Sequence, residues 1–168
     1  MPPAVPGYVV AQRLGHGGSS EVWAARCEAT GEEVALKRLR VGSDPAAREE
    51  LRAEAALLAS FTHPNILGLR GVRGDETGLV LILDRAVGSL GDLIRARGRL
   101  GAGQAVAIAA AIADALGAAH RRGIVHADVS ASNVLLRADG TPLLADLGTA
   151  RLIRVSSGTA RSPIARAK

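Results

Sequence analysis

The stretch from Ile124 to Gly148 constrains this chain more than any other part of its sequence. Within it, short apolar runs flank a polar loop that carries Asp128 and Asn133. Asp139-Gly140 is a strong turn signal, so the apolar runs on either side of it are expected to pair as a tight hairpin. Asp146 follows the second run directly. We therefore expect the hairpin to hold Asp128, Asn133 and Asp146 close together.

Three such side chains in one place suit a site for a magnesium-bound phosphate. Mg²⁺ prefers oxygen ligands and usually divides its coordination between protein oxygens and the phosphates of a substrate. Two of the three side chains would supply ligands to the metal. The third, a carboxylate, would accept a proton from a nucleophile. The stretch therefore predicts phosphoryl-transfer chemistry.

The length and charge of the chain narrow the class of protein. A chain of 168 residues has room for one domain with a substantial core, and with 2% aromatic residues that core must consist of Ala, Leu, Val and Ile. The net charge of +5 lies at the end: residues 151–168 carry five basic and no acidic side chains, whereas residues 1–150 carry 16 of each. The body is therefore neutral, which argues against nucleic-acid binding, and residues 152–168 are expected to form a basic, flexible tail.

The sequence also predicts a location. A single cysteine, Cys27, excludes an internal disulfide and agrees with a reducing cytosol, so a cytoplasmic protein is expected. The first residues lack the basic and apolar regions of a signal peptide. The most apolar run, Ala105–Ala119, contains Asp114 and is too short to span a bilayer. We therefore expect no membrane segment in this chain.

The N-terminal part reads as strands separated by turns. Strands are expected at Tyr8–Leu14, Glu21–Cys27 and Glu33–Leu39. The run Gly15–Ser20 between the first two is either a simple hairpin turn or a loop whose backbone N–H groups approach phosphate oxygens. Lys37, on the third strand, is either an exposed lysine or a cation aimed at those phosphates.

A helix should follow the third strand. Asp44-Pro45 is typical of a helix start, with Asp as N-cap and Pro in the first turn, and we expect the helix to reach about Phe61. At 100° per residue, Glu54 falls within the apolar stripe of this helix. A buried glutamate needs a partner, for which Lys37 is the candidate; the alternative is a partly exposed glutamate.

The remaining elements follow from similar signals. Strands are expected at Leu67–Arg73 and Gly78–Leu83. The spacing of Ser89 and Asp92 is that of a capping box and predicts a short helix. A longer, alanine-rich helix is expected over Gly103–His120.

Taken in order, these motifs resemble those of bacterial serine/threonine protein kinases, from Tyr8 to about Arg151. Six motifs match in sequence order: the glycine-rich loop Gly15-x-Gly17-x-x-Ser20-x-Val22, the lysine motif Val34-Ala35-Leu36-Lys37, the helix glutamate Glu54 nine residues before His63-Pro64-Asn65, the hinge Ile82–Arg85, the catalytic loop His126-x-Asp128-x-x-x-x-Asn133 and the magnesium-binding Asp146-Leu147-Gly148.

The resemblance implies an α+β fold. A five-stranded antiparallel N-lobe sheet with one main helix would be followed by an incomplete helical C-lobe. The implied kinase-like domain is 8–151, divided into an N-lobe (8–83), a hinge (82–88) and a partial C-lobe (89–151).

The resemblance also implies that ATP and Mg²⁺ bind between the lobes. Lys37 would hold the α- and β-phosphates and Glu54 would position Lys37. Asp128 would be the catalytic base, while Asn133 and Asp146 would hold magnesium. The other implied ATP contacts come from the glycine-rich loop, the third strand and the hinge, with Ile82 as gatekeeper: Leu14, Gly15, His16, Gly17, Gly18, Ser19, Ser20, Val22, Ala35, Ile82 and Asp84.

Several positions depart from the family pattern. Ala127 stands where the family has an arginine, so regulation through a phosphorylated activation loop is not expected. Ser130 stands where serine/threonine kinases have a lysine that contacts the moving phosphate, and a lost donor of this kind costs about 10²–10³ in rate. Ser20 replaces the third loop glycine and Leu147 a phenylalanine, which are small changes. The chain also ends soon after Gly148, so a truncated or frameshifted product is expected.

The leading functional prediction is magnesium-dependent transfer of the ATP γ-phosphate to Ser or Thr of an unknown protein substrate, impaired by truncation. One alternative is a non-catalytic nucleotide-binding or scaffold fragment. Another is a small-molecule phosphotransferase, whose loop also has His-x-Asp followed by Asn; the glycine-rich loop and His63-Pro64-Asn65 favour the protein kinases. The Gly103–His120 helix would lack its usual cover, which predicts self-association through the C-lobe.

Overall fold

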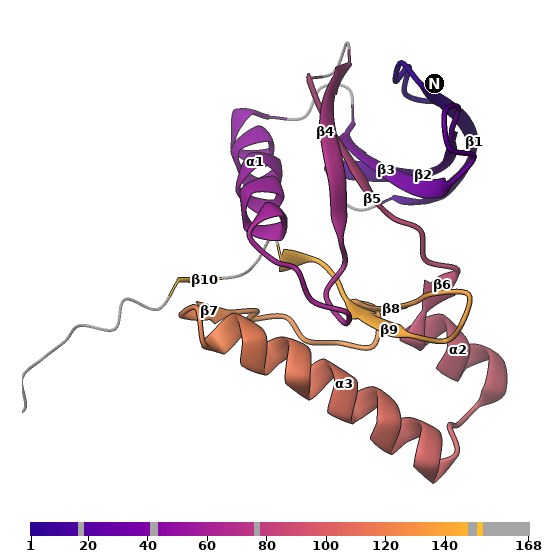
Figure 1. Cartoon of the computed structure of the whole chain (residues 1–168), viewed down its shortest axis with the longest axis vertical. Coiled ribbons are helices and arrows are strands. Elements are labelled where there is room, and N and C mark those ends of the chain that lie inside the picture. The colour runs from indigo at the N-terminus through magenta and orange to yellow at the C-terminus, as the bar shows by residue number, and fades with distance from the viewer. Residues whose placement is uncertain (17–18, 41–43, 76–77, 148–150, 153–168) are drawn as a thin grey trace, which may run out of the picture.

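The computed structural model describes residues 1–16, 19–40, 44–75, 78–147 and 151–152. Its N-terminal lobe is a twisted five-stranded antiparallel sheet with one helix against it (Figure 1). The predicted fold class is therefore confirmed. The sheet has the order β1-β2-β3-β5-β4 and consists of β1 (Tyr8–His16), β2 (Ser20–Cys27), β3 (Glu33–Leu39), β4 (Leu69–Asp75) and β5 (Gly78–Asp84).

The alternation of side chains along β3 and β5 gives the sheet two different faces. Ala35 pairs with Leu83 in the register, and both belong to the core cluster that includes α1. Leu36 pairs with Ile82, and both belong to a second cluster on the opposite face, which Val5 of the N-terminal segment completes. Period-two alternation therefore decides which residues of these strands can reach the space between the lobes.

Helix α1 (Pro45–Ala59) begins where the sequence predicted. The Asp44 side chain accepts a hydrogen bond from the backbone N–H of Ala47, as an N-cap residue does. The helix ends two residues before the predicted Phe61. Glu54 lies on its buried face.

Within the described residues, the C-terminal lobe contains two helices and short strands (Figure 1). The Asp139-Gly140 turn joins two strands that pair antiparallel, and Gly140 has φ +86°, which glycine adopts without strain. The predicted hairpin is therefore present. The elements are β6 (Gly88–Ser89), α2 (Leu90–Arg97), α3 (Ala102–His120), β7 (Ile124–Val125), β8 (Val134–Leu136), β9 (Pro142–Leu144) and β10 (Arg151–Leu152).

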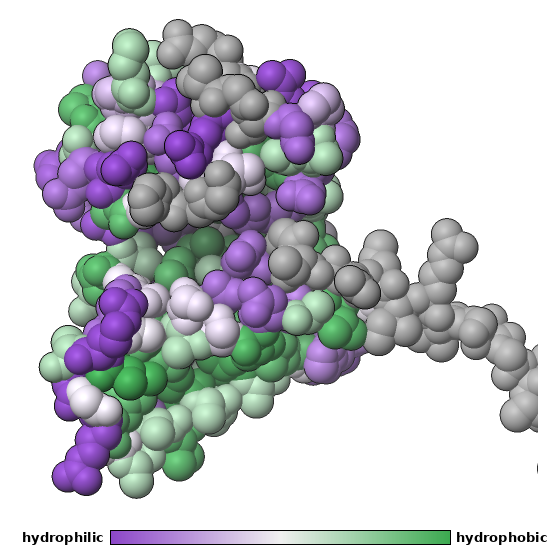
Figure 2. Space-filling model, turned by 180° about the vertical axis from the view of Figure 1, so that it is seen from behind, coloured by the Kyte–Doolittle hydropathy of each residue, from purple (hydrophilic) through white to green (hydrophobic). Residues whose placement is uncertain are grey.

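Helix α3 is less exposed than the sequence predicted. Its larger apolar residues Ile108 and Ile112 are buried, so the outer face consists mainly of alanine together with Val106, which is 68% exposed. Figure 2 shows the resulting apolar band across the lower lobe. The Gly103–His120 helix was expected to lack its usual cover, but its isoleucine side chains are covered because they pack toward β7 and β9.

The length of α3 also corrects an expectation. The predicted apolar run of Ala105–Ala119 is part of a 19-residue helix, and within the described residues this helix is long and apolar enough to cross a membrane by length and composition alone. Core helices of water-soluble domains meet the same criterion when they are mostly buried, whereas 22% of the apolar window of α3 is buried; the buried residues of the helix are Ile108, Ile112, Ala115 and Ala119.

Candidate active site

A cavity of about 430 Å³ lies between the two lobes. One end of it is apolar and is bordered by the chain that connects the lobes. The other end is polar, with Lys37, Glu54, Asn133 and Asp146. The apolar walls come from β1, β2, β3, β5 and β8 together with the segment before β4, and consist of Leu14, Val22, Ala35, Leu67, Leu83 and Leu135.

Lys37 and Glu54 form an ion pair at the polar end. The Lys37 Nζ donates hydrogen bonds of 2.7 and 2.6 Å to the Glu54 Oε1 and Oε2 atoms. The side chains are only 16% and 5% exposed, so the pair is shielded from water. The partnership that the sequence predicted is therefore present, and it holds the ammonium group at the cavity wall.

Asp128 and Asn133 lie on one loop and contact each other. The Asn133 Nδ2 donates 2.9 Å hydrogen bonds to the backbone oxygen and to the Oδ2 of Asp128. The amide nitrogen is thus engaged, which leaves the Asn133 Oδ1 as the atom able to ligate a cation. Asn133 lines the cavity, whereas Asp128 is exposed and is not among the residues that line it.

A buried histidine connects this loop with Asp146. The His126 ring is 1% exposed; its Nε2 donates to the Ala145 carbonyl oxygen at 2.9 Å, and its Nδ1 accepts from the Asp128 N–H at 3.3 Å. These two partners require the neutral ring with the proton on Nε2. His126 therefore sets the position of Asp128 relative to Asp146. The sequence motif contains His126, but its spacing alone assigned this residue no role.

Two non-glycine residues of the site have left-handed backbone conformations. Ala127 has φ 65° and Asp146 has φ 61°. For an ordinary L-residue this conformation costs about 1–2 kcal/mol. It turns the chain before Asp128 and after Ala145, and Asp146 lines the cavity at the second of these turns.

The apolar end of the cavity corrects one predicted residue. Ile82 was expected to be the gatekeeper, but it lies in the core cluster on the far face of the sheet and is 1% exposed. Leu83 lines the cavity instead, in register with Ala35. The motif spacing placed the gatekeeper one residue too early, and only the strand register shows which side chain faces inward.

Asp84 also differs from expectation. It borders the cavity, but its carboxylate oxygens accept hydrogen bonds from Arg70 and Arg137 at 2.6 and 2.5 Å. A carboxylate engaged in this way is directed at the protein. Asp84 therefore contributes to the cavity wall but does not offer a side-chain ligand to a bound molecule.

The other predicted contacts divide into three groups. Leu14, Gly15, Ser20, Val22 and Ala35 line the cavity, and Ser19 lines a smaller adjoining cavity with Lys37, Glu54 and Asp146. His16 ends β1 opposite Glu21. Gly17, Gly18, Gly148 and residues 153–168 of the predicted tail lie outside the described residues. The lining also includes residues that had not been assigned as ATP contacts, among them Leu67, Val87, Ser89, Asp92, Ser132 and Leu135.

The oxygen donors at the polar end fit a magnesium–phosphate group better than a bare metal. Among the residues that the structure describes, no cluster of three His, Cys, Asp or Glu side chains could hold a metal ion. Mg²⁺ needs only one or two protein carboxylates when phosphate oxygens and water complete its shell. Asp146 and the Asn133 Oδ1 fit that requirement.

Comparison with known proteins agrees with this arrangement. The protein kinase domain model matches residues 8–164. The serine/threonine-protein kinases PkaA and PkaB of Streptomyces coelicolor are 36% and 35% identical, over 90% and 87% of this chain. Sperm motility kinase 2B of Mus musculus is 34% identical over 84% of it. The chain spans between 29% and 37% of the length of these relatives. With a family model matched over most of its length, this chain belongs to the protein kinase family.

Proposed function

We propose that this domain binds Mg-ATP between its lobes and transfers the γ-phosphate to a serine or threonine hydroxyl of a protein. The observation that carries the proposal is the shared cavity: the Lys37–Glu54 pair opens on the same space as Asn133 and Asp146. A cation and two metal-ligating oxygens at one end suit the phosphates of a nucleoside triphosphate, and the apolar slot at the other end suits its base.

The apolar slot supports binding of the adenine base. Val22 and Ala35 of the N-terminal lobe and Leu135 of the C-terminal lobe are in position to cover its two faces, and Leu83 closes the inner end. The backbone of residues 84–86 borders the same slot and can supply hydrogen bonds to its edge. Such a mostly apolar pocket with a few directed polar groups is the usual form of a small-molecule site.

At the polar end, the protein contributes charge and orientation. Lys37 would offset the negative charge of the α- and β-phosphates, and Glu54 keeps its ammonium group in place. Asp146 and the Asn133 Oδ1 would hold magnesium, which would supply positive charge next to the phosphates. Asp128, which is hydrogen-bonded to the cavity residue Asn133, would accept the proton of the incoming hydroxyl.

The sequence of the catalytic loop predicts slow phosphoryl transfer. Ser130 replaces the expected lysine, and its hydroxyl is hydrogen-bonded to Ser132 at 2.9 Å. Neither serine can place a positive charge on the transferring phosphate. Loss of one such donor typically costs about 10²–10³ in rate. We therefore propose nucleotide binding with weak phosphoryl transfer.

Titration with a fluorescent ATP analogue and magnesium tests the binding step. Lys37→Met and Asp146→Asn should each weaken binding strongly. Arg26→Met is the matched control, because Arg26 is an exposed cation on the neighbouring strand and forms a 3.8 Å ion pair with Glu33 outside the cavity. Equal affinity of all four proteins would show that the site is assigned wrongly.

A radiolabelled γ-phosphate assay tests the chemical step, with Asp128→Ala as the blank. Transfer to protein that depends on Asp128 supports a protein kinase. Nucleotide binding without any transfer supports the scaffold alternative, and transfer only to small alcohols or amines supports the small-molecule phosphotransferase. Ser130→Lys should raise the transfer rate if the missing cation limits it.

The apolar outer face of α3 supports a separate proposal, self-association through this face. Because it consists of alanine and Val106, we expect weak association, measurable by light scattering as a mass that rises with concentration. A constant monomer mass would contradict it. We also propose that residues 82–88 form the hinge between the two lobes. The proposed kinase function further suggests a cytoplasmic location, where ATP is available and cysteine stays reduced.

A further inference from the structure

Asp84 occupies the point at which the chain leaves the sheet for the C-terminal lobe. It is the last residue of β5, and Gly88 begins β6 of the C-terminal lobe four residues later. Its backbone N–H donates to the Gly68 carbonyl at 2.9 Å. Gly68 directly follows a segment that is bonded to β9, through Leu67 N–H and the Leu144 carbonyl at 2.9 Å. The chain passes between the lobes once near Gly68 and once at Asp84, and this hydrogen bond joins the two segments.

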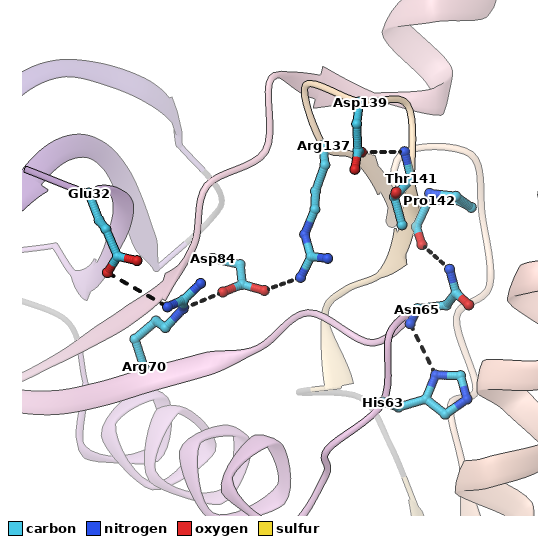
Figure 3. A network of polar contacts seen from close by, with 9 residues as sticks. All are labelled: Glu32, His63, Asn65, Arg70, Asp84, Arg137, Asp139, Thr141 and Pro142. Carbon is cyan, nitrogen blue, oxygen red and sulfur yellow. Dashed lines mark hydrogen bonds and ion pairs between the residues drawn. The ribbon is translucent and has the colours of Figure 1, made fainter.

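The carboxylate of Asp84 is held from both lobes at once (Figure 3). Arg70 of β4, in the N-terminal lobe, donates from Nε to Oδ1 at 2.6 Å. Arg137, directly after β8 in the C-terminal lobe, donates from Nη2 to Oδ2 at 2.5 Å. We call these three residues, Arg70, Asp84 and Arg137, the Asp84 bridge.

The carboxylate of the bridge is buried, so its hydrogen bonds can contribute to the free energy of folding. Asp84 is 7% exposed, whereas the side chains of Arg70 and Arg137 are 52% and 36% exposed. Burial alone would raise the pKa of Asp84, but the hydrogen bonds from the two arginines outweigh burial and hold its pKa below the ordinary value. Without the carboxylate, two guanidinium groups would face each other and repel.

The two arms of the bridge differ in what they connect. Arg70 and Asp84 lie on adjacent strands of one sheet, so their contact survives any rotation between the lobes. Arg137 follows a strand of the C-terminal lobe, and its contact with Asp84 must lengthen when the lobes turn apart. Beside it, the Val87 N–H donates to the Leu136 carbonyl at 2.8 Å, a backbone contact that no side-chain substitution removes.

We propose that the contact between Arg137 and Asp84 in this bridge sets the angle between the lobes, and that Arg137 is the positioning residue through which it controls nucleotide affinity. The proposal rests on the proposed function, because a nucleotide in the cavity must contact both lobes together. A bridge that favours the closed angle increases the fraction of molecules competent to bind. When this fraction falls, the apparent dissociation constant rises in the same proportion.

The two arms of one carboxylate provide a matched pair of variants. Arg137→Gln should weaken binding of a fluorescent ATP analogue by roughly fivefold or more, the lower end of couplings between sites. Arg70→Gln removes an equally direct hydrogen bond to the same carboxylate within one lobe, and should change affinity by less than about twofold. Arg137→Lys, which keeps a cation within reach of Asp84, should recover part of the loss.

A distance measurement gives a readout that does not depend on nucleotide. Cys27, on β2, is the single cysteine of the chain, and Arg97→Cys on α2 adds a second labelling site in the other lobe. Electron paramagnetic resonance between spin labels at these two positions should show a broader distance distribution for Arg137→Gln than for wild type. Arg70→Gln should leave the distribution unchanged. If Arg137→Gln does not fold, Arg137→Lys is measured in its place and should show intermediate broadening.

The outcomes separate this inference from the proposed function. A wild-type protein that binds no ATP analogue refutes the proposed function, and the distance measurement then still decides whether the bridge sets the lobe angle. A wild-type protein that binds the analogue, with Arg137→Gln equal to it in affinity and in distance distribution, overturns the inference. Equal losses of affinity in Arg70→Gln and Arg137→Gln also overturn it, because they would show a local effect on Asp84.

Discussion

The guanidinium of Arg122 lies over the ring of Phe61, 4.6 Å from the ring centroid. Arg122 also donates a hydrogen bond to the Ser60 carbonyl at the end of α1. Ser60 is the C-cap of α1, and Arg122 follows the last turn of α3, so the contact joins the ends of two helices from different lobes. It fixes the end of the helix that carries Glu54.

Replacement of Arg122 should therefore destabilise the protein and loosen α1. Arg122→Ala removes a cation–π contact worth about 0.5–1 kcal/mol at an exposed site and a hydrogen bond worth about 1 kcal/mol. We expect a loss of roughly 1–2 kcal/mol in the free energy of unfolding, measured by urea denaturation. Arg121→Ala is the control, because Arg121 is an exposed neighbour without these contacts to Ser60 and Phe61. An equal loss in both variants would contradict this role of Arg122.

Gly68 should tolerate no side chain. A Cβ atom at this position would lie 2.8 Å from the Asp84 Oδ2 and 3.1 Å from its Cγ, so alanine must displace the carboxylate from its arginines. Overpacking of this kind typically costs about 1–3 kcal/mol. Gly71→Ala, three residues further along in β4, is the control, since its Cβ would meet its nearest atom, the Ile82 Cδ1, at an ordinary 3.6 Å. Thermal unfolding should show a clear fall in Tm for Gly68→Ala and a small change for Gly71→Ala. A reversed order would contradict the packing described for Asp84.

The Asp84 bridge should also make stability depend on acid. The pKa of Asp84 is lowered from its ordinary value of 3.8 in the folded protein, so the folded state binds its proton less readily than the unfolded chain does. Its stabilising contribution is therefore complete above about pH 3.8 and is lost as the pH falls below that value toward the lower folded pKa. Asp84→Asn should be less stable than wild type at pH 6, and the difference should shrink as the solution becomes more acidic. A difference that stays constant down to pH 3 would count against the depressed pKa.

How much of this site was visible in the sequence depends on the kind of interaction. Asp139-Gly140 and Asp44-Pro45 are local signals, and the hairpin and the start of α1 are where they predicted. The Lys37–Glu54 pair was also predictable, because a glutamate on the packing face of a helix needs a partner and Lys37 on the preceding strand was the candidate.

Contacts that depend on three separate segments were not predictable. Asp84, Arg70 and Arg137 carry no spacing signal, since the bridge arises only when β4, β5 and the end of β8 meet. The role of His126 depends in the same way on the Ala145 carbonyl, a backbone atom that has no signature in the sequence. Long-range geometry of this kind is a property of the packed fold.

The inward-facing residue of β5 gives the last prediction, because adjacent residues there have opposite roles. Leu83 lines the cavity, whereas Ile82 is buried in the cluster on the far face of the sheet. Both positions are packed, so a larger side chain at either should cost about 1–3 kcal/mol of stability. Only Leu83→Phe also places its extra volume in the cavity, where it competes with the bound base. We expect Leu83→Phe to weaken binding of the fluorescent ATP analogue at least about tenfold, equivalent to roughly 1.4 kcal/mol, while Ile82→Phe binds as wild type does once folded.

Denaturation curves measure the loss of stability and binding curves measure the loss of nucleotide affinity, so the two effects can be separated on the same preparations. If Ile82→Phe lost nucleotide affinity while Leu83→Phe kept it, the strand register described here would be wrong by one residue.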